Sequence, residues 1–324
     1  MRKIQKTLIN STYQAINGAA LVPGFMIPFD CYIKRFNNYV IIIKAGTVIS
    51  KALSEQIQTK QLFIANDDRQ KYDTYKKEGK DISSLTEKFS SITQLDADVK
   101  EKIFKIYSLI NQYMNDYFSK ESHELNMSII NHYTDAILAI ILNSNYELKD
   151  FSVSLATVYS ESSHSVNVSI LSALFAKANG FDYDMIRDIV IAGLLHDCGK
   201  RSMDKKILDK NSSLTDEEFA LMKEHPVRGV EEAKHIGVTK QTILEAIGGH
   251  HEKLDGSGYP EGVFSARISE ASQIIAICDT FDALTTQRTF RDKFSSFDSL
   301  LMMKNEMSEQ LNKSYIAKFI KMFR

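Results

Sequence analysis

Hydrophobic and polar positions follow two different patterns in the first part of the chain and in the rest. Up to about residue 64, the stretches "MIPFDCYIK", "NYVIIIKAGTVIS" and "QLFIAN" are rich in β-branched and aromatic residues. Such runs favour strands, and Asn37 and Asn38 suit a turn between the first two. We expect a small β-containing module here, whose apolar runs form a core rather than a ligand site.

The stretch from residue 66 to about 95 is polar and has no clean apolar period, which is typical of a linker or an exposed helix. Beyond it the pattern becomes helical almost everywhere. In "VKEKIFKIYSLINQYMNDYF", apolar residues recur at spacings of three and four and would form one stripe of a helix: Ile103, Ile106, Ile110, Met114 and Tyr117. The later part of the chain is therefore expected to be built from helices.

These patterns predict an α+β protein in three parts. A small β-containing domain spans residues 1–95, a helical connector spans 96–150, and an all-α domain spans 151–324. The first part holds no metal-ligand cluster or phosphate-binding loop, so we interpret it as regulatory.

Two helix boundaries can be read from capping residues. Gly180 is expected at the end of one helix, because glycine accepts the left-handed conformation common there. Thr215 and Glu218 form a capping-box pattern at the start of another helix. We expect that helix to run to His225 and Pro226.

Composition narrows the class of protein. A chain of 324 residues exceeds the usual single domain, and its formal net charge of −1 offers no broad basic field, which disfavours a binder of nucleic acid polymers. Cys31, Cys198 and Cys278 lie far apart, which favours reduced thiols in a cytoplasmic protein. The longest apolar runs are too short to span a bilayer, so no membrane association is expected.

Imidazole and carboxylate side chains gather in the later helices. His196 and Asp197 end an apolar helix, and such a pair can bind one metal while the second carboxylate oxygen bridges to another. Asp279 interrupts an apolar helix, where an unpaired carboxylate would be costly. Five histidines and two aspartates together suit two transition-metal ions: His164, His196, Asp197, His225, His250, His251 and Asp279.

Three motifs in this region resemble one known family. "HDCGK" resembles its HD-x-GK element, and "HHEKLDGSGYP" resembles its HHE-x-x-DG-x-GYP element almost letter for letter. "DTFDALTTQRTFR" is similar to its third motif, with Phe290 in place of a tyrosine. The region from about Phe151 to Phe294 thus resembles the HD-GYP family, a branch of the HD phosphohydrolases. This resemblance implies that the all-α domain is an HD-type catalytic domain.

The resemblance also implies roles for the cluster. By this likeness one metal would be held by His164, His196, Asp197 and Asp279, and Asp197 would bridge to a second metal held by His225, His250 and His251. Members of the family hydrolyse cyclic di-GMP, a bacterial second messenger, often with iron or manganese. The implied reaction is attack of a metal-activated water on a phosphodiester, with pGpG, GMP or both as products.

Charged residues near the motifs suit contacts with phosphate. Lys200 can place a point charge on a phosphate oxygen or protonate the leaving 3′ oxygen, and a solvated surface lysine is the alternative. Arg288 and Arg291 lie three residues apart and can face the same way to grip phosphate or guanine edges. Exposed arginines are common, so the spacing alone is weak evidence for a binding role. The family resemblance makes that role more favourable.

The glycine-rich part of the second motif suits a tight turn. Gly256 and Gly258 would let backbone N–H groups approach a ligand, and Pro260 would stiffen the exit of the turn. Tyr259 would then face a guanine or a phosphate. We expect this turn to contribute to substrate binding.

A third metal is a further expectation, and it depends on Glu161. Some members of the family carry a glutamate four residues before the first histidine ligand, where this chain has Ser160. Glu161 lies three residues before His164. A residue three or four positions before His164 lies on the same face of a helix as His164. A third ion would add positive charge facing a dianionic substrate. The alternative is a solvated glutamate.

Three functions stay open from the sequence. The first is an active cyclic di-GMP phosphodiesterase, and the second is a module of the same fold that binds cyclic di-GMP or docks a protein with little turnover. The third is an HD phosphohydrolase for another nucleotide, which the Gly-Tyr-Pro motif disfavours. A homodimer and a protein partner at the Gly-Tyr-Pro region also stay open.

Overall fold

The computed structural model describes residues 13–21, 27–36, 38–47, 49–119, 123–152, 159–208, 210, 212–287 and 293–323. The chain divides into two compact units. The first comprises residues 1–87 with 126–129, and the second comprises 88–125 with 130–324. The expected division at residue 95, with a separate connector over 96–150, stays a prediction.

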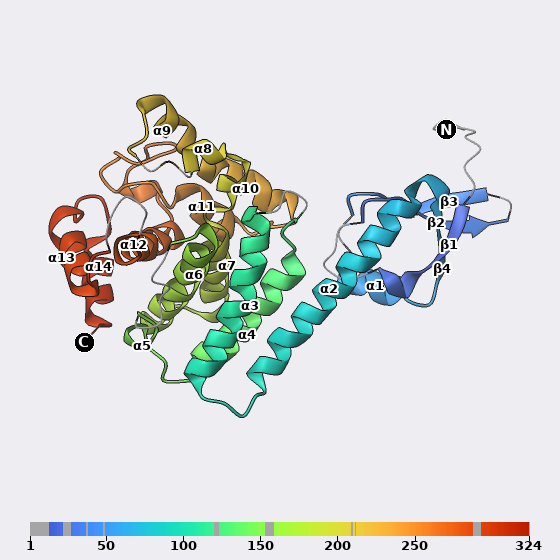
Figure 1. The fold of residues 1–324 in the computed structure, drawn as a ribbon, viewed down its shortest axis with the longest axis horizontal. Coiled ribbons are helices and arrows are strands. Elements are labelled where there is room, and N and C mark those ends of the chain that lie inside the picture. The colour runs from blue at the N-terminus through green and yellow to red at the C-terminus, as the bar shows by residue number, and fades with distance from the viewer. Residues whose placement is uncertain are drawn as a thin grey trace. The chain divides into compact units, whose positions relative to one another are not determined.

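The first unit contains one antiparallel sheet (Figure 1). Its four strands, in the order β1-β4-β2-β3, are β1 Tyr13–Asn17, β4 Gln61–Ala65, β2 Cys31–Arg35 and β3 Asn38–Ile43. One helix, α1 Lys51–Ile57, precedes β4. Side chains buried at alternate strand positions form the core, among them Ile16, Leu62 and Ile64. The β-rich pattern predicted for this part of the chain is confirmed.

The polar stretch after residue 66 forms a long helix, α2 Arg69–Thr93. Its helical state was one of the two alternatives, but the helix is not exposed all round. Tyr72 and Tyr75 are buried against the edge of Phe29, with ring centroids 5.6 and 5.5 Å away. Phe89 is buried near the other end. The buried positions do recur at helical spacings, but one of them is a glycine and the residues between them are polar, which obscured the period in the sequence: Tyr72, Tyr75, Gly79, Ile82, Phe89 and Ile92.

The rest of the described chain is helical. Its helices are α3 Val99–Ser119, α4 Met127–Leu142, α5 Leu148–Ser152, α6 Glu161–Ala178, α7 Tyr183–Leu195, α8 Lys205–Leu208, α9 Asp216–Met222, α10 His225–His235, α11 Gln241–Gly249, α12 Glu270–Thr285, α13 Ser296–Glu306 and α14 Lys313–Lys321. The predicted stripe of α3 is buried, from Ile103 to Tyr117. The α+β class of the whole chain is thereby confirmed.

Helix α6 is the central element of the second unit. Every residue from Ser162 to Ala176 is buried, because α3, α7 and α12 pack around it (Figure 1). Small side chains, many of them serine and alanine, allow these neighbours to approach closely. This packing holds the ends of α7 and the middle of α12 near the start of α6.

Two predicted helix boundaries have different outcomes. Gly180 follows the end of α6 with φ of +74°, and Thr215 and Glu218 form the expected capping box of α9. The predicted length of that helix is wrong, since α9 ends at Met222 and a new helix, α10, begins at His225. Pro226 explains the break, because proline cannot donate a backbone hydrogen bond to the preceding turn and is favoured in a first turn.

Two further observations bear on the sequence expectations. All three cysteines are buried, free thiols. Within the described part of the chain, no helix combines the length and the hydropathy that a membrane crossing requires.

Candidate metal centre

The seven residues proposed as metal ligands come together in the second unit. Ends of helices supply most of them: His196 and Asp197 follow α7, His225 begins α10, and His250 and His251 follow α11. His164 comes from the first turns of α6 and Asp279 from the middle of α12. Their gathering is a consequence of helix packing, since α6, α7 and α12 pack on one another and α11 packs on α7, α10 and α12.

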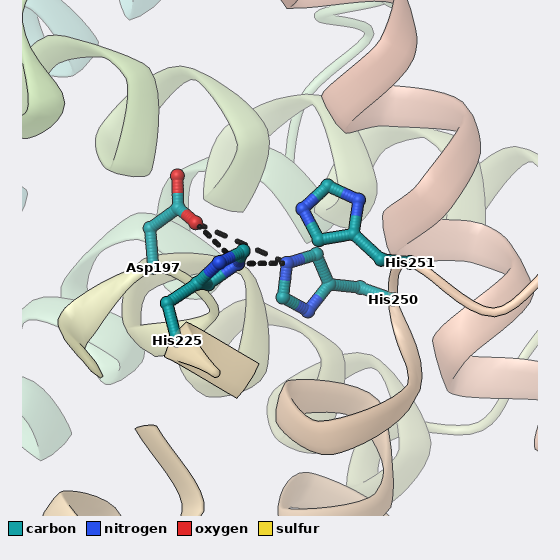
Figure 2. Close-up of side chains that lie close together, drawn as sticks. All are labelled: Asp197, His225, His250 and His251. Carbon is teal, nitrogen blue, oxygen red and sulfur yellow. Dashed lines mark hydrogen bonds and ion pairs between the residues drawn. The ribbon is translucent and has the colours of Figure 1, made fainter. Parts of the chain in front are cut away.

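Asp197 is common to two sets of ligand atoms. In each set the ligand atoms all lie within 4.8 Å of one another: Asp197, His225, His250 and His251 form one set, and His164, His196 and Asp197 form the other. Figure 2 shows the carboxylate of Asp197 facing the rings of the first set. An aspartate with one oxygen for each of two groups of imidazoles has the arrangement of a bridging ligand.

Distances around Asp197 support this arrangement. Its Oδ1 lies 3.2 Å from Nε2 of His225, and its Oδ2 lies 3.3 Å from Nε2 of His196 and 3.6 Å from Nε2 of His164. The Oδ1 atom is buried and makes no hydrogen bond to any described residue. Asp279 Oδ1 lies 3.1 Å from Nε2 of His164. A buried carboxylate oxygen without a hydrogen bond, among imidazole nitrogens, fits a metal-binding site.

Three of the histidine rings are held by backbone carbonyls. In each, Nδ1 lies at hydrogen-bond distance from the carbonyl oxygen three residues earlier: His196 to Gly193 at 2.9 Å, His225 to Met222 at 2.8 Å and His250 to Ile247 at 2.7 Å. A carbonyl can only accept, so Nδ1 carries the proton and donates. The Nε2 atom of each ring is therefore the one left to bind a metal.

His164 is held by a side chain instead. Its Nδ1 lies 2.7 Å from Asp282 Oδ2, and the other oxygen of Asp282 accepts a hydrogen bond of 2.8 Å from Asn167. Asp282 is fully buried. A carboxylate behind a ligating imidazole orients the ring and raises its basicity. Asp282 had no role in the sequence analysis, although its spacing of three from Asp279 on one helix was a usable signal.

Electrostatics keep the ligands in metal-binding forms. Burial is the main cause that lowers the pKa of His251 to about 3 and holds that of His250 well below its ordinary value, so both rings are neutral at pH 7. Burial opposes ionisation of Asp197, but His196 and Lys200 outweigh it and hold the pKa of this carboxyl well below its usual range. Neutral imidazole and ionised carboxylate are the forms that bind divalent cations.

The pKa of His164 shifts in the opposite direction. Burial would lower it, but hydrogen bonds and charge from Asp279 and Asp282 prevail and raise it to about 10. Without a metal, the ring thus carries a proton between two carboxylates. A bound cation would displace this proton and balance the negative charge of the carboxylates in its place.

Lys200 is not the solvated surface lysine that the sequence left as an alternative. Its side chain is only 13% exposed, and its Nζ lies 2.6 Å from Asp197 Oδ2 and 3.3 Å from Glu161 Oε2. Burial opposes protonation, but the two carboxylates raise the pKa of Lys200 well above its ordinary value. The ammonium group is thus a fixed positive charge beside the cluster.

The turn that carries Lys200 is supported from behind by α3. This 3-10 turn, η3 Cys198–Ser202, directly follows Asp197. The buried hydroxyl of Tyr117 donates a hydrogen bond of 3.0 Å to the Cys198 carbonyl, and the Arg201 guanidinium lies 4.5 Å from the centre of the Tyr117 ring. The end of the predicted apolar stripe therefore holds the turn in place.

A cleft of about 1450 Å³ opens onto the cluster. Five of the seven candidate ligands line it, whereas His196 and His250 are fully buried. Three lysines also line it: Lys200, Lys210 and Lys253. The cleft is larger than a typical small-molecule pocket. Three carboxylates line it as well, those of Glu161, Asp197 and Asp279, so bound cations would supply the net positive charge that favours an anionic ligand.

The Gly-Tyr-Pro segment contributes Tyr259 to the lining of this cleft. Gly256 has φ of +79°, and a Cβ atom on Gly258 would lie 2.3 Å from the backbone nitrogen of Lys253, so only glycine fits there. Tyr259 stacks on His251, with ring centroids 4.7 Å apart and an angle of 27°. The structure thus places Tyr259 beside the cluster. Arg288 and Arg291 lie outside the described residues.

Glu252 anchors this segment, and the sequence analysis did not single it out. Its buried carboxylate accepts hydrogen bonds from the backbone N–H groups of Glu261, Gly262 and Val263, at 2.7, 3.2 and 3.0 Å. The motif contained a signal, because a glutamate directly after two buried ligands requires partners of its own. The candidate ligand His251 is therefore linked, through the next residue in the chain, to the backbone that follows the Gly-Tyr-Pro motif.

We expect Glu252→Gln to loosen the segment. A glutamine has one carbonyl oxygen, and its amide N–H group would face a backbone donor, so at least one buried N–H loses its partner at a cost of about 1–3 kcal/mol. Thermal unfolding should occur at a lower temperature, and amide exchange at residues 261–263 should become faster. Glu261→Gln is the matched control, because that side chain is 70% exposed. Unchanged exchange in Glu252→Gln would contradict the anchoring role.

Comparisons with known proteins agree with this geometry. The HD-domain family matches residues 148–313. A cyclic di-GMP phosphodiesterase of Pseudomonas aeruginosa is 33% identical over 140 residues, which make up 43% of this chain and 34% of that protein. The 3′3′-cGAMP-specific phosphodiesterase 1 of Vibrio cholerae is 35% identical over 145 residues, 45% of this chain and 33% of that protein. The matching segment spans about a third of the length of these relatives.

A solved structure supplies the likeness in fold. An HDGYP protein from Bdellovibrio bacteriovorus superposes with a TM-score of 0.57 at 19% identity, over 96% of this chain and 99% of that chain. The family match covers half of the chain, and the motifs that carry the resemblance lie within it. The chain belongs to the HD-domain family, in its HD-GYP branch.

Proposed function

We propose that the chain is a metal-dependent phosphodiesterase that hydrolyses cyclic di-GMP. The observation that carries this proposal is the position of Asp197, shared by two sets of ligand atoms at the base of a cleft lined by lysines. A cyclic dinucleotide has two phosphodiester charges, which matches such a cleft. Similar proteins that carry the names of cyclic di-GMP and 3′3′-cGAMP phosphodiesterases support the substrate class.

The donor set supports the proposed cofactors. His164, His196, Asp197 and Asp279 would hold one ion, and Asp197 would share a second with His225, His250 and His251. Imidazole and carboxylate donors without thiolate suit iron or manganese. When bound, two such ions would lower the pKa of a water molecule and neutralise charge on the phosphate.

The chain's own residues would bind and orient the substrate. Lys200, beside Asp197, is proposed to contact a phosphate oxygen or to donate a proton to the leaving 3′ oxygen. Tyr259, which lines the cleft, is proposed to face the nucleotide, and the turn at Gly256 and Gly258 is proposed to contribute to substrate binding. Arg288 and Arg291 are proposed as further phosphate or guanine contacts.

The proposal is tested with anaerobically purified protein whose metals have been measured. Cyclic di-GMP, 3′3′-cGAMP, linear dinucleotides and mononucleotides are offered in parallel, and the products are separated by chromatography. Metal-dependent conversion of cyclic di-GMP to pGpG, GMP or both is the expected result. Tight binding without product would instead indicate a binding module, and preference for a noncyclic nucleotide would indicate another HD phosphohydrolase.

A third ion is proposed beside Glu161. This residue lines the cleft with His164 and shares the Lys200 ammonium group with Asp197, so a positive charge already lies between the two carboxylates. Glu161→Ala is expected to lower the metal content by one equivalent per chain, measured by elemental analysis of both proteins. Two equivalents in wild type and variant alike would overturn the third site.

The regulatory role of residues 1–95 remains part of the proposal. Sheet and helix α1 form a core with no catalytic cluster among the described residues of this segment. A homodimer and a protein partner at the Gly-Tyr-Pro segment also remain proposals.

A further inference from the structure

We propose that Phe219, on helix α9, stacks on a purine base of the substrate and sets the affinity of the cleft for cyclic dinucleotides. This inference rests on the function proposed above. Phe219 lines the cleft together with five of the metal-ligand candidates, and it is 43% exposed. A single exposed aromatic residue needs no explanation by itself, so the proposal depends on its surroundings.

Phe219 continues a row of rings that begins at the cluster. His251, a ligand candidate, stacks on Tyr259 at 4.7 Å and 27°, and Tyr259 meets the ring of Phe219 at 6.2 Å and 81°. A nucleotide is also extended, because one sugar separates its base from its phosphate. With the phosphate at the cluster, a base would reach the far end of this row.

Helix α9 is held firmly enough to present the ring. The capping box of Thr215 and Glu218 fixes its start, and the carboxylate of Glu218 also pairs with Lys210 on the rim of the cleft. The Lys223 ammonium group lies 4.6 Å from the centre of the Phe219 ring. A cation near an aromatic ring is attracted to its π-face. Lys223 thus covers one face of the ring, and a base would stack on the other.

Stacking on an aromatic side chain is a sequence-tolerant way to bind a nucleobase, because every base has a π-face. The phosphates of the same ligand would be met by the lysines that line the cleft. Phe219 therefore supplies the contact that distinguishes a dinucleotide from a simple phosphate ion. It would be a binding residue that is remote from the reacting atoms.

Helix α9 also provides a matched control. Leu221 is 45% exposed, close to the value for Phe219, but it does not line the cleft. Phe219→Ala and Leu221→Ala therefore remove similar exposed apolar side chains from one helix. A difference between them reports on the cleft rather than on the stability of α9.

The test uses the metal-loaded full chain as wild type, Phe219→Ala, Phe219→Tyr and Leu221→Ala. KM and kcat are measured for cyclic di-GMP. Kd is measured by equilibrium dialysis for cyclic di-GMP in its hydrolysis-resistant phosphorothioate form, and for inorganic phosphate as a probe without a base. Phe219→Ala is expected to raise KM and Kd for cyclic di-GMP about tenfold, with a smaller change in kcat. Phe219→Tyr should restore most of the affinity, and Leu221→Ala should resemble wild type.

Two outcomes would overturn the stacking role: an unchanged Kd for cyclic di-GMP in Phe219→Ala, or an equal loss of affinity for inorganic phosphate. The proposed function fails separately, if wild type with its metals bound does not hydrolyse a cyclic dinucleotide. In that case the dialysis measurement still decides the inference, since absent or unchanged binding rejects it and a tenfold loss in Phe219→Ala alone supports it.

Discussion

Asp197→Asn is expected to lower the turnover of cyclic di-GMP by about 1000-fold or more while the chain remains folded. Both oxygens of Asp197 lie within 3.6 Å of imidazole nitrogens from two ligand sets. An amide removes the negative charge and replaces one donor oxygen by an N–H group, which cannot bind a cation. Each ligand set therefore loses part of its affinity, and Lys200 loses its partner at 2.6 Å.

Metal content, kcat and thermal unfolding should be measured on the same preparation. Asp188→Asn is a matched control, because Asp188 is a buried aspartate of helix α7 that pairs with Lys240 at 3.0 Å, outside the cluster. The control should unfold at a slightly lower temperature and keep near-normal turnover. Near-normal hydrolysis by Asp197→Asn would show that Asp197 does not bridge the two ligand sets.

Asp282→Asn is expected to weaken metal binding by about 10- to 100-fold. The variant keeps the shape of the side chain but removes the charge that lies 2.7 Å from the ring of His164. His164 would become a less basic and less firmly oriented ligand. Metal affinity is measured by competition with a chelator of known strength, and activity is measured as the metal concentration is raised.

The response to added metal separates two roles of Asp282. A residue that positions His164 should give a variant whose activity returns in large part at high metal concentration. Activity that stays low with the metals fully bound would indicate direct participation in the reaction instead. Unchanged metal affinity would reject the positioning role, because the buried ring of His164 would then not need this carboxylate.

The sequence indicated the candidate ligands better than the residues that orient them. A His-Asp pair alone is a weak signal, but five histidines and two aspartates on mostly helical segments, within motifs that resemble one family, indicate a site before any fold is known. Asp282 and Glu252 were missed because their function depends on partners distant in sequence or on backbone groups. Asp282 contacts a ring 118 residues away, and Glu252 binds N–H groups 9 to 11 residues further on.

Element boundaries show a similar limit. The stripe of α3 was predicted because its apolar residues recur every three or four positions, whereas the buried stripe of α2 includes Gly79 and has a two-turn gap between Ile82 and Phe89, so it does not read as a clean apolar period. The break between α9 and α10 depends on Pro226, whose restriction on the chain can end one helix or begin another. Here it begins one, and this places His225 at the first residue of α10.

Backbone carbonyl groups orient three of the histidine rings, and this affects which substitutions the region can tolerate during evolution. A backbone acceptor is present whatever amino acid occupies the position, so exchange of Met222 or Ile247 for another helix-compatible residue leaves the orientation of His225 and His250 intact. The orientation of His164 depends on one particular amino acid, because its acceptor is the side chain of Asp282. Among the groups that orient these four rings, Asp282 is therefore the one that tolerates substitution least.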